Sequence, residues 1–220
     1  MAQAQVLRTL TVEGKGVTSI NAHIAIIHLQ ILVQGNSIQE TQSKIANRSN
    51  ALVNLLKSRG VDQLKTKGVS LNPNYRYRKG KNVPVGYEAK TSVSFRVKTD
   101  QAGIIMAEAI KAGANQVEDI WLVATDEEIK SAQKATIREA TLDAQGKAQA
   151  ALEPLGFSIK EVVGIQVDGA SAPPVLLTVP EGAGILSGQR ATSYEDETPS
   201  VQIVSGEQEI KSSVTLQITY

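Results

Sequence analysis

Residues 87–98 read Tyr-Glu-Ala-Lys-Thr-Ser-Val-Ser-Phe-Arg-Val-Lys and carry the clearest period-two pattern in the chain. The odd positions are mainly apolar, and the even positions are polar or charged. Because successive side chains of a strand point to opposite faces, this alternation predicts a strand with one buried and one exposed face. Half-buried strands of this kind are typical of antiparallel sheets that are covered on one side only.

A second strand is predicted for residues 20–34. Its odd positions from Ala25 to Val33 are all apolar, whereas its even positions mix aliphatic residues with histidine and glutamine. Ser37 and Glu40 follow with the spacing of a capping box, which predicts the start of a helix. Arg59 and Gly60 supply a basic residue and a glycine where that helix should end.

The same reading extends to the rest of the chain. Further strands are predicted at residues 6–12, 64–71, 116–124, 161–167 and 207–220. Helices are predicted to begin near residue 100 and, at a capping box of Thr125 and Glu128, near residue 126. A loop is expected to start at residues 72–74, and residues 80–84 are turn residues. Residues 14–16, Gly-Lys-Gly, predict a turn after the first strand. The expected order is ββαββαβαβ-loop-β. This order predicts an α+β fold, a largely antiparallel sheet with helices packed on one face.

The length of 220 residues suits one domain or at most two. We expect a tail at residues 1–5 and a single domain over residues 6–220. Within it, residues 169–199 contain Pro173, Pro174, several glycines and the acidic run at residues 195–197. This composition predicts a long Pro/Gly-rich loop.

The composition excludes several kinds of chemistry. The chain has no cysteine, so disulfides, thiol catalysis, Cys-ligated zinc and iron–sulfur clusters are ruled out. Lys and Arg number 23 and Asp and Glu 22, a net charge of +1 that indicates no dedicated nucleic-acid binder. No stretch approaches the roughly 20 apolar residues of a membrane span, so none is expected.

The histidines and the hydroxyl residues form no recognisable catalytic pattern. His23 and His28 lie five residues apart on a predicted strand, so they should face opposite sides and cannot share a metal ion. Ser131 and Lys134 match a Ser-x-x-Lys nucleophile pattern, but its companion motifs are absent from the sequence. We therefore predict a non-enzymatic protein with no catalytic residues, no metal site and no cofactor.

The segment of residues 65–98 has the most asymmetric charge. It carries nine basic residues and a single acidic one, Glu88, and tyrosines lie among them. The candidate interaction surface within it consists of Tyr75, Arg76, Tyr77, Arg78, Lys79 and Lys81. This pattern fits an exposed hairpin tip, a protein contact, or a surface for single-stranded nucleic acid. We favour the first two over nucleic acid because the near-neutral chain lacks a wider electropositive footprint.

The order of several short motifs resembles the SIMPL domain family, also called DUF541, which includes bacterial periplasmic proteins. The resemblance covers about residues 6–220. It rests on Thr-Val-Glu-Gly-Lys-Gly at residues 11–16, Leu-Asn-Pro-Asn-Tyr-Arg-Tyr at 71–77, Gly-Tyr-Glu-Ala at 86–89, Ala-Gly-Ala-Asn-Gln-Val at 112–117 and Gly-Ile at 164–165.

The resemblance implies a function without established enzymatic activity. Similar bacterial proteins are exported, some form ring-shaped homo-oligomers, and some are linked to oxidative stress, so we expect a periplasmic or otherwise extracytoplasmic location. Residues 1–5, Met-Ala-Gln-Ala-Gln, fit either a start just after signal cleavage or an ordinary cytosolic start. The first hypothesis is an exported homo-oligomer with the basic hairpin and the final strand as contacts. The alternative is a protein-binding adaptor that uses the hairpin and the long loop.

Overall fold

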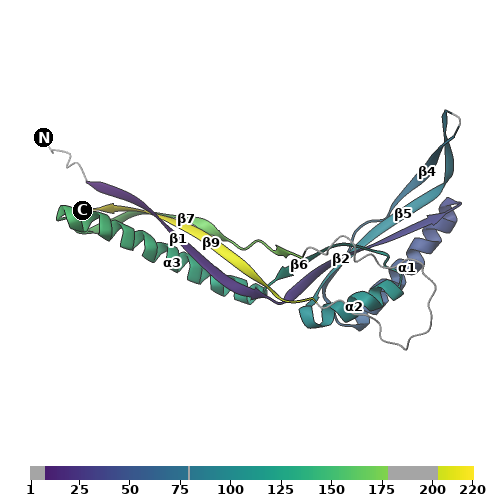
Figure 1. The fold of residues 1–220 in the computed structure, drawn as a ribbon, viewed down its shortest axis with the longest axis horizontal. Coiled ribbons are helices and arrows are strands. Elements are labelled where there is room, and N and C mark those ends of the chain that lie inside the picture. Colours follow the sequence, from purple (N-terminus) through teal and green to yellow (C-terminus); the bar gives the residue numbers. More distant parts are fainter. Residues whose placement is uncertain (1–7, 79, 178–202) are drawn as a thin grey trace. The chain divides into compact units, whose positions relative to one another are not determined.

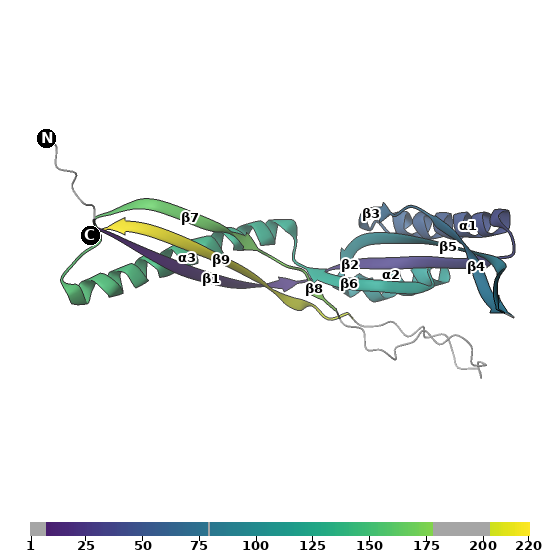
Figure 2. The same cartoon turned by 90° about the horizontal axis from the view of Figure 1, so that it is seen from above.

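The computed structural model describes residues 8–78, 80–177 and 203–220, except for the side chain of Arg78. Three helices, a short 3-10 turn and nine strands are found in these residues (Figures 1 and 2). In chain order they are β1 Thr9–Ala22, β2 Ile24–Gly35, α1 Ile38–Ser58, β3 Asp62–Thr66, β4 Ser70–Arg78, β5 Lys81–Lys98, α2 Thr99–Lys111, β6 Gln116–Val123, α3 Asp126–Leu152, η1 Glu153–Leu155, β7 Glu161–Ser171, β8 Val175–Leu176 and β9 Gly206–Thr219.

The chain separates into two compact units, each with its own sheet. Unit 1 comprises Met1–Ala22, Ala124–Val175 and Gly206–Tyr220, and unit 2 comprises His23–Val123 and Leu176–Ser205. Strands β1, β9 and β7 form a three-stranded sheet, and β3, β5, β2, β6 and β8, with β4 beside β5, form a six-stranded one. The pairs of the first sheet, β1–β9 and β7–β9, are antiparallel. The pairs β2–β5, β2–β6, β3–β5 and β4–β5 of the second sheet are antiparallel as well. The predicted α+β fold with a largely antiparallel strand arrangement is confirmed.

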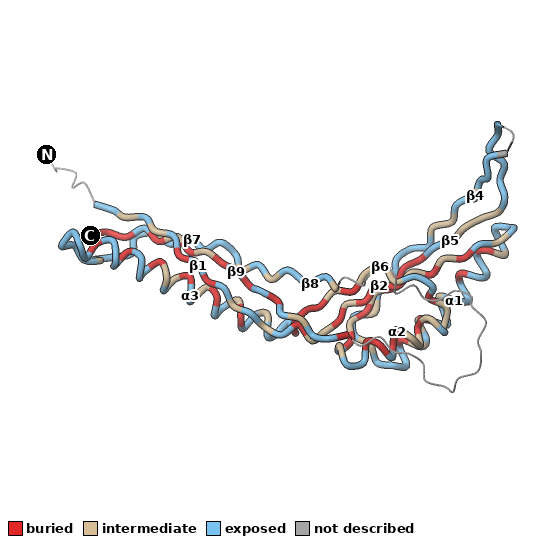
Figure 3. The backbone as a smooth tube through the Cα atoms, viewed as in Figure 1, coloured by how far each residue is buried: buried red, intermediate tan, exposed pale blue. Residues whose placement is uncertain are grey.

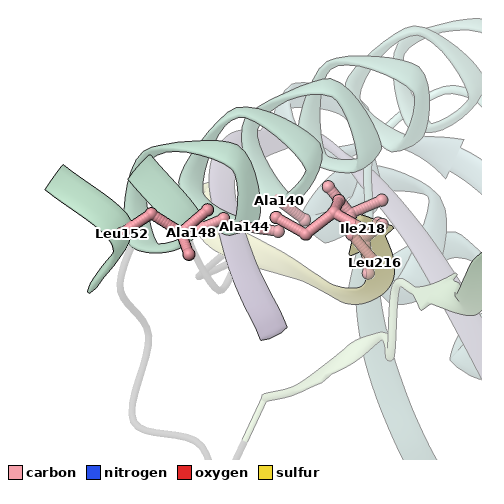
Figure 4. Packing of buried hydrophobic residues seen from close by; sticks show 7 residues of the cluster. Ala140, Ala144, Ala148, Leu152, Leu216 and Ile218 are labelled. Carbon is pink, nitrogen blue, oxygen red and sulfur yellow. The ribbon is translucent and has the colours of Figure 1, made fainter. Parts of the chain in front are cut away.

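In unit 1, helix α3 lies across one face of the three-stranded sheet. Ala140, Ala144 and Ala148 recur every four residues along α3 and pack on Leu216 and Ile218 of β9 (Figure 4). Alanine keeps the helix close to the strands, because its side chain is only a methyl group. The capping box predicted at Thr125 and Glu128 starts this helix.

The predicted turn at residues 14–16 is wrong, because these residues lie in the middle of β1. Gly14 pairs with Val214 and Gly16 with Ser212 without interrupting the ladder. A Cβ on Gly14 would lie 2.0 Å from the carbonyl oxygen of Ala140, and one on Gly16 would lie 2.2 Å from that of Thr136. The two glycines are therefore required for the close approach of α3, not for chain reversal.

In unit 2, α1 and α2 cover one face of the six-stranded sheet. The odd residues of β2, including Ile27, Leu29 and Ile31, are fully buried on that face. Phe95 of β5 and Ile120 of β6 contribute to the same core. Ser37 accepts a hydrogen bond from the Glu40 amide, so α1 begins where the capping pattern predicted.

The predicted order ββαββαβαβ-loop-β needs two more strands. The predicted strand at residues 64–71 is two shorter segments, β3 and β4, and β4 continues through residues 72–78, where a loop was expected. Both strands pair with the same side of β5: β3 lies opposite its C-terminal part and β4 opposite its N-terminal part. Residues 80–84, predicted as turn residues, mostly belong to β5 itself.

The predicted loop at residues 169–199 falls mainly outside the described residues. Of its described part, residues 169–171 complete β7, and Val175 and Leu176 form β8. The expected tail, residues 1–5, also lies outside the described residues. The single domain expected over residues 6–220 stays a prediction.

Candidate functional site

The outer part of the β4–β5 hairpin extends beyond the sheet of unit 2. Strand β5 pairs with β2 only as far as Gly35 opposite Tyr87, whereas its pairing with β4 continues to Arg78 opposite Lys81. We call this extension, residues 74–78 and 81–86, the ribbon. It rises from the sheet on the side away from α1 and α2 (Figure 1).

A glycine and a bulge mark the point where the ribbon leaves the sheet. The register of β4 on β5 shifts between Asn74 and Tyr75, so Val85 is an extra residue in β5. Gly86 has a φ of +144°, which only glycine adopts readily, and a Cβ there would lie 2.7 Å from the carbonyl oxygen of Gly35. The bulge at Val85 and the glycine at position 86 therefore allow the hairpin to change direction where it leaves the sheet.

A polar network lies near the base of the ribbon, at the start of α1. The Glu40 carboxylate accepts hydrogen bonds from the Asn36 amide at 2.9 Å and from the Lys44 ammonium at 2.6 Å. These contacts, led by the Lys44 hydrogen bond, lower the pKa of Glu40. The network borders a shallow polar cavity of about 200 Å³ that Asn74 and Gly86 also line.

The register of the ribbon separates the tyrosines from the cations. Tyr75 pairs with Pro84 and Tyr77 with Asn82, so these four residues share one face. Arg76 pairs with Val83, and Lys81 lies two residues away from Val83, so these three residues share the other face.

The ribbon residues are largely exposed (Figure 3). Tyr75 and Tyr77 are 56% and 72% exposed, and Val83 and Val85 are 43% and 45% exposed. Of the six residues predicted as an interaction surface, Tyr75, Arg76, Tyr77 and Lys81 lie together on the ribbon. Lys79 and the side chain of Arg78 lie outside the description.

Sequence reasoning missed a second exposed surface, in unit 1. Val162, Ile165 and Val167 of β7 pair with Ile218, Leu216 and Val214 of β9, so they lie on the sheet face that α3 covers. The β9 residues are buried, but the β7 residues are 43%, 66% and 47% exposed. Helix α3 thus covers β1 and β9 and leaves the apolar residues of β7 at the surface. The run of valines and isoleucine at residues 162–167 indicates an apolar strand but not that the strand is exposed.

The final strand, predicted as a contact of the homo-oligomer, is the central strand of the unit 1 sheet. Strand β9 lies between β1 and β7 and pairs with both along most of its length. Its backbone edges are therefore used within unit 1, and the edge strands of that sheet are β1 and β7.

The histidines take structural positions. His28 of β2 bonds through Nδ1 to the carboxylate of Asp119 on β6, and Ser94 lies opposite His28 on β5. Among the described residues, no hydrogen bond joins Ser94 to His28. His23 lies between β1 and β2 and accepts a backbone hydrogen bond from Thr99.

Metal-binding clusters and membrane helices were also sought. Within residues 8–78, 80–177 and 203–220, no group of three or more His, Asp or Glu side chains is placed to hold a metal ion. No helix in the same ranges combines the length and apolarity needed to cross a bilayer.

The comparison with protein families now bears on this fold. The model of the SIMPL family, described as a protein of unknown function (DUF541), matches residues 10–218. The chain belongs to the SIMPL family. The match confirms the predicted resemblance over nearly the whole chain and includes both the ribbon and β7. A search of curated proteins finds no match to this SIMPL protein.

Proposed function

We propose that this SIMPL protein is a non-enzymatic, exported protein that self-assembles. The observation that carries the proposal is the uncovered apolar face of β7. Val162, Ile165 and Val167 continue the buried face of β9 but lie beyond the reach of α3. Covering the exposed half of such side chains stabilises an interface by about 1 kcal/mol each.

The two edges of the unit 1 sheet differ in how many contacts α3 makes with them, and this difference supports the proposal. On the β1 edge, α3 closes the strand with side chains: Asp143 accepts from the Lys15 amide, Glu139 accepts from the Val17 amide, and Lys147 donates to the Glu13 carbonyl. On the β7 edge, Gln133 donates to the carbonyl of Ala170 near the strand end. Val162, Ile165 and Val167 stay exposed, and an open apolar edge of this kind favours pairing with another chain.

The test is the absolute mass in solution, measured by light scattering after size exclusion over a range of protein concentrations. We expect a discrete multiple of 23.5 kDa, and a single large mass that is independent of concentration would favour a closed ring. The Ile165→Lys and Val167→Lys variant should lower the mass, whereas Leu142→Lys, at a 60% exposed position of α3, should not. A wild-type mass of 23.5 kDa at every concentration would overturn the proposal.

The exported location is part of the proposal and rests on the family. Fractionation of cells that express the full gene tests it directly, because an exported chain is released with the extracytoplasmic fraction. The link to envelope or stress physiology also rests on the family alone. Recovery of the protein only with cytosolic markers would contradict export.

A protein-binding adaptor is the second candidate, favoured by the exposed tyrosines and arginine of the ribbon. Tyrosine and arginine are residue types that often anchor protein interfaces. Replacing Arg76, Arg78 and Lys79 together should abolish capture of a defined partner. Unchanged capture by this variant would exclude the ribbon as the recognition surface.

A further inference from the structure

The charge of the ribbon region is uniform over a long stretch. Between Asp62 and Glu88 the chain has no acidic residue, and it has six basic ones: Lys65, Lys67, Arg76, Arg78, Lys79 and Lys81. The whole chain carries a net charge of only +1, so this positive charge is local. Any electrostatic attraction to a polyanion is therefore directed to the ribbon and its surroundings.

The geometry brings two of these cations, Arg76 and Lys81, to exposed positions on the ribbon. Residues 81–86 extend past the last β2–β5 pair, which corresponds to about 20 Å of strand. The ribbon exposes Tyr75 and Tyr77 on one face and Arg76, Val83 and Lys81 on the other. An isolated two-stranded ribbon is only marginally stable, so a surface that contacts both faces would also stabilise it.

The combination of side chains favours a bilayer surface over other polyanions. Tyrosine is enriched at the membrane–water interface, where its ring is apolar and its hydroxyl stays hydrated. Lysine and arginine bind anionic headgroups at the same depth. A planar surface requires a projecting element and no pocket, whereas protein hot spots concentrate in well-packed pockets. Nucleic acid would be attracted more strongly by a chain with a wider basic footprint.

We propose that the ribbon docks on the surface of an anionic phospholipid bilayer. The end of the ribbon enters the headgroup layer, so both of its faces meet lipid. Arg76 and Lys81 contact phosphate groups on one face, and Tyr75 and Tyr77 on the other face lie at the boundary between headgroups and acyl chains. The contact is peripheral and reversible, since the ribbon is far too short to span a bilayer. The proposal goes beyond self-assembly and does not depend on it, because it uses unit 2 and the proposed assembly surface lies on β7.

The test is flotation of the full chain with vesicles of phosphatidylglycerol and phosphatidylcholine, compared with vesicles of phosphatidylcholine alone. Each Lys or Arg near an anionic surface raises binding roughly fivefold. The Arg76→Gln and Lys81→Gln pair should therefore lower the partition coefficient about 25-fold. The matched control is the Lys130→Gln and Lys134→Gln pair on α3, which removes the same charge from exposed positions and should leave binding nearly unchanged.

The aromatic contribution is measured separately. Tyr75→Ser with Tyr77→Ser should weaken binding even at high salt, where the electrostatic contribution is screened. A Tyr77→Trp variant should be quenched by brominated lipids, while Trp121 in the wild-type chain should not. Circular dichroism of every variant shows whether the fold is retained.

Three outcomes would overturn the proposal. The first is equal flotation with neutral and anionic vesicles, and the second is an equal loss of binding in the ribbon pair and the α3 control pair. The third is ribbon-dependent binding to soluble poly-glutamate without flotation, which would assign the ribbon to an acidic polypeptide. The solution mass is measured without lipid, so a monomeric mass contradicts self-assembly and leaves this inference untouched.

Discussion

The amide of Lys15 in β1 donates a 2.8 Å hydrogen bond to the Asp143 carboxylate of α3. Lys147 binds the same carboxylate oxygen at 2.7 Å, and these two contacts, the Lys147 hydrogen bond first, lower the pKa of Asp143. A helix side chain thus satisfies a backbone donor on an edge strand. The edge of β1 is thereby protected from pairing with another chain.

This relationship predicts a specific loss of stability in acid. Because the pKa of Asp143 is lower in the folded state, the carboxylate stabilises the fold above its unfolded value of 3.8 and loses that contribution as pH falls through the folded pKa. The melting temperature of Asp143→Asn should therefore fall less than that of the wild type between pH 5 and pH 2.5. Glu161→Gln, at an exposed carboxylate of β7, serves as control. Parallel pH profiles for wild type and Asp143→Asn would contradict the prediction.

Two glycine substitutions should have opposite effects on unfolding. Gly14→Ala places a methyl group 2.0 Å from the Ala140 carbonyl oxygen and should destabilise unit 1 by about 1–3 kcal/mol through overpacking. Gly146→Ala, on α3, meets nothing within 4 Å and should stabilise by about 0.5–1 kcal/mol through helix propensity. Urea unfolding measures both. A neutral Gly14→Ala would mean that α3 does not lie this close to β1.

Gln208 of β9 is fully buried and joins β9 to two other backbone segments of unit 1. Its Oε1 accepts from the Ala124 amide at 3.0 Å, and its Nε2 donates to the carbonyls of Ala172 and Pro173. Gln208→Leu leaves these groups unpaired and should cost about 1–3 kcal/mol for each one that stays buried. Gln217→Ala, at an exposed position of the same strand, should change stability by less than about 0.5 kcal/mol. Equal unfolding midpoints for the two variants would disprove the role of Gln208.

Amide hydrogen exchange should divide β5 into two parts. Residues 89–97 lie between β2 on one side and β3 or β4 on the other, and they should exchange slowly. Residues 81–86 pair with β4 alone among the described strands and should exchange much faster. Exchange detected by mass spectrometry of overlapping peptides checks this. Uniform protection along β5 in a monomeric sample would show that the ribbon is supported by another contact.

The ion pair between α1 and α2 should contribute little. Arg59 donates through Nε to Glu108 Oε2 at 2.7 Å and through Nη2 to Glu108 Oε1. The Arg59 side chain is nevertheless half exposed. A double-mutant cycle with Arg59→Gln and Glu108→Gln should give a coupling of at most about 1 kcal/mol, decreasing with salt. A larger, salt-insensitive coupling would indicate that the helices depend on this pair.

Local patterns in the sequence were sufficient for the elements that they predicted correctly. The alternation in residues 87–98 and 24–34 and the capping boxes at Ser37 and Thr125 involve neighbours within about one helical turn. Such signals depend on the chain itself and hold wherever the element is placed.

Long-range packing was decisive where prediction failed. Gly14 and Gly16 suggest a turn locally, but the backbone of α3, more than 100 residues away, requires glycine in a strand there. Residues 72–78 contain proline and asparagine and form a strand because β5 pairs with them. The exposure of β7 cannot be predicted from its sequence, since its apolar residues resemble those of a buried strand.

The sequence by itself determined the family, the α+β class, the lack of cysteine chemistry and the basic, tyrosine-rich composition of residues 75–81. Only the tertiary structure decided that β9 is central, that α3 leaves the apolar residues of β7 exposed, and that β5 extends beyond its last pair with β2 at Gly35. The physical reason is that periodicity shows which side of an element is apolar. Whether that side is covered depends on the lengths and positions of partners that lie far away in the chain.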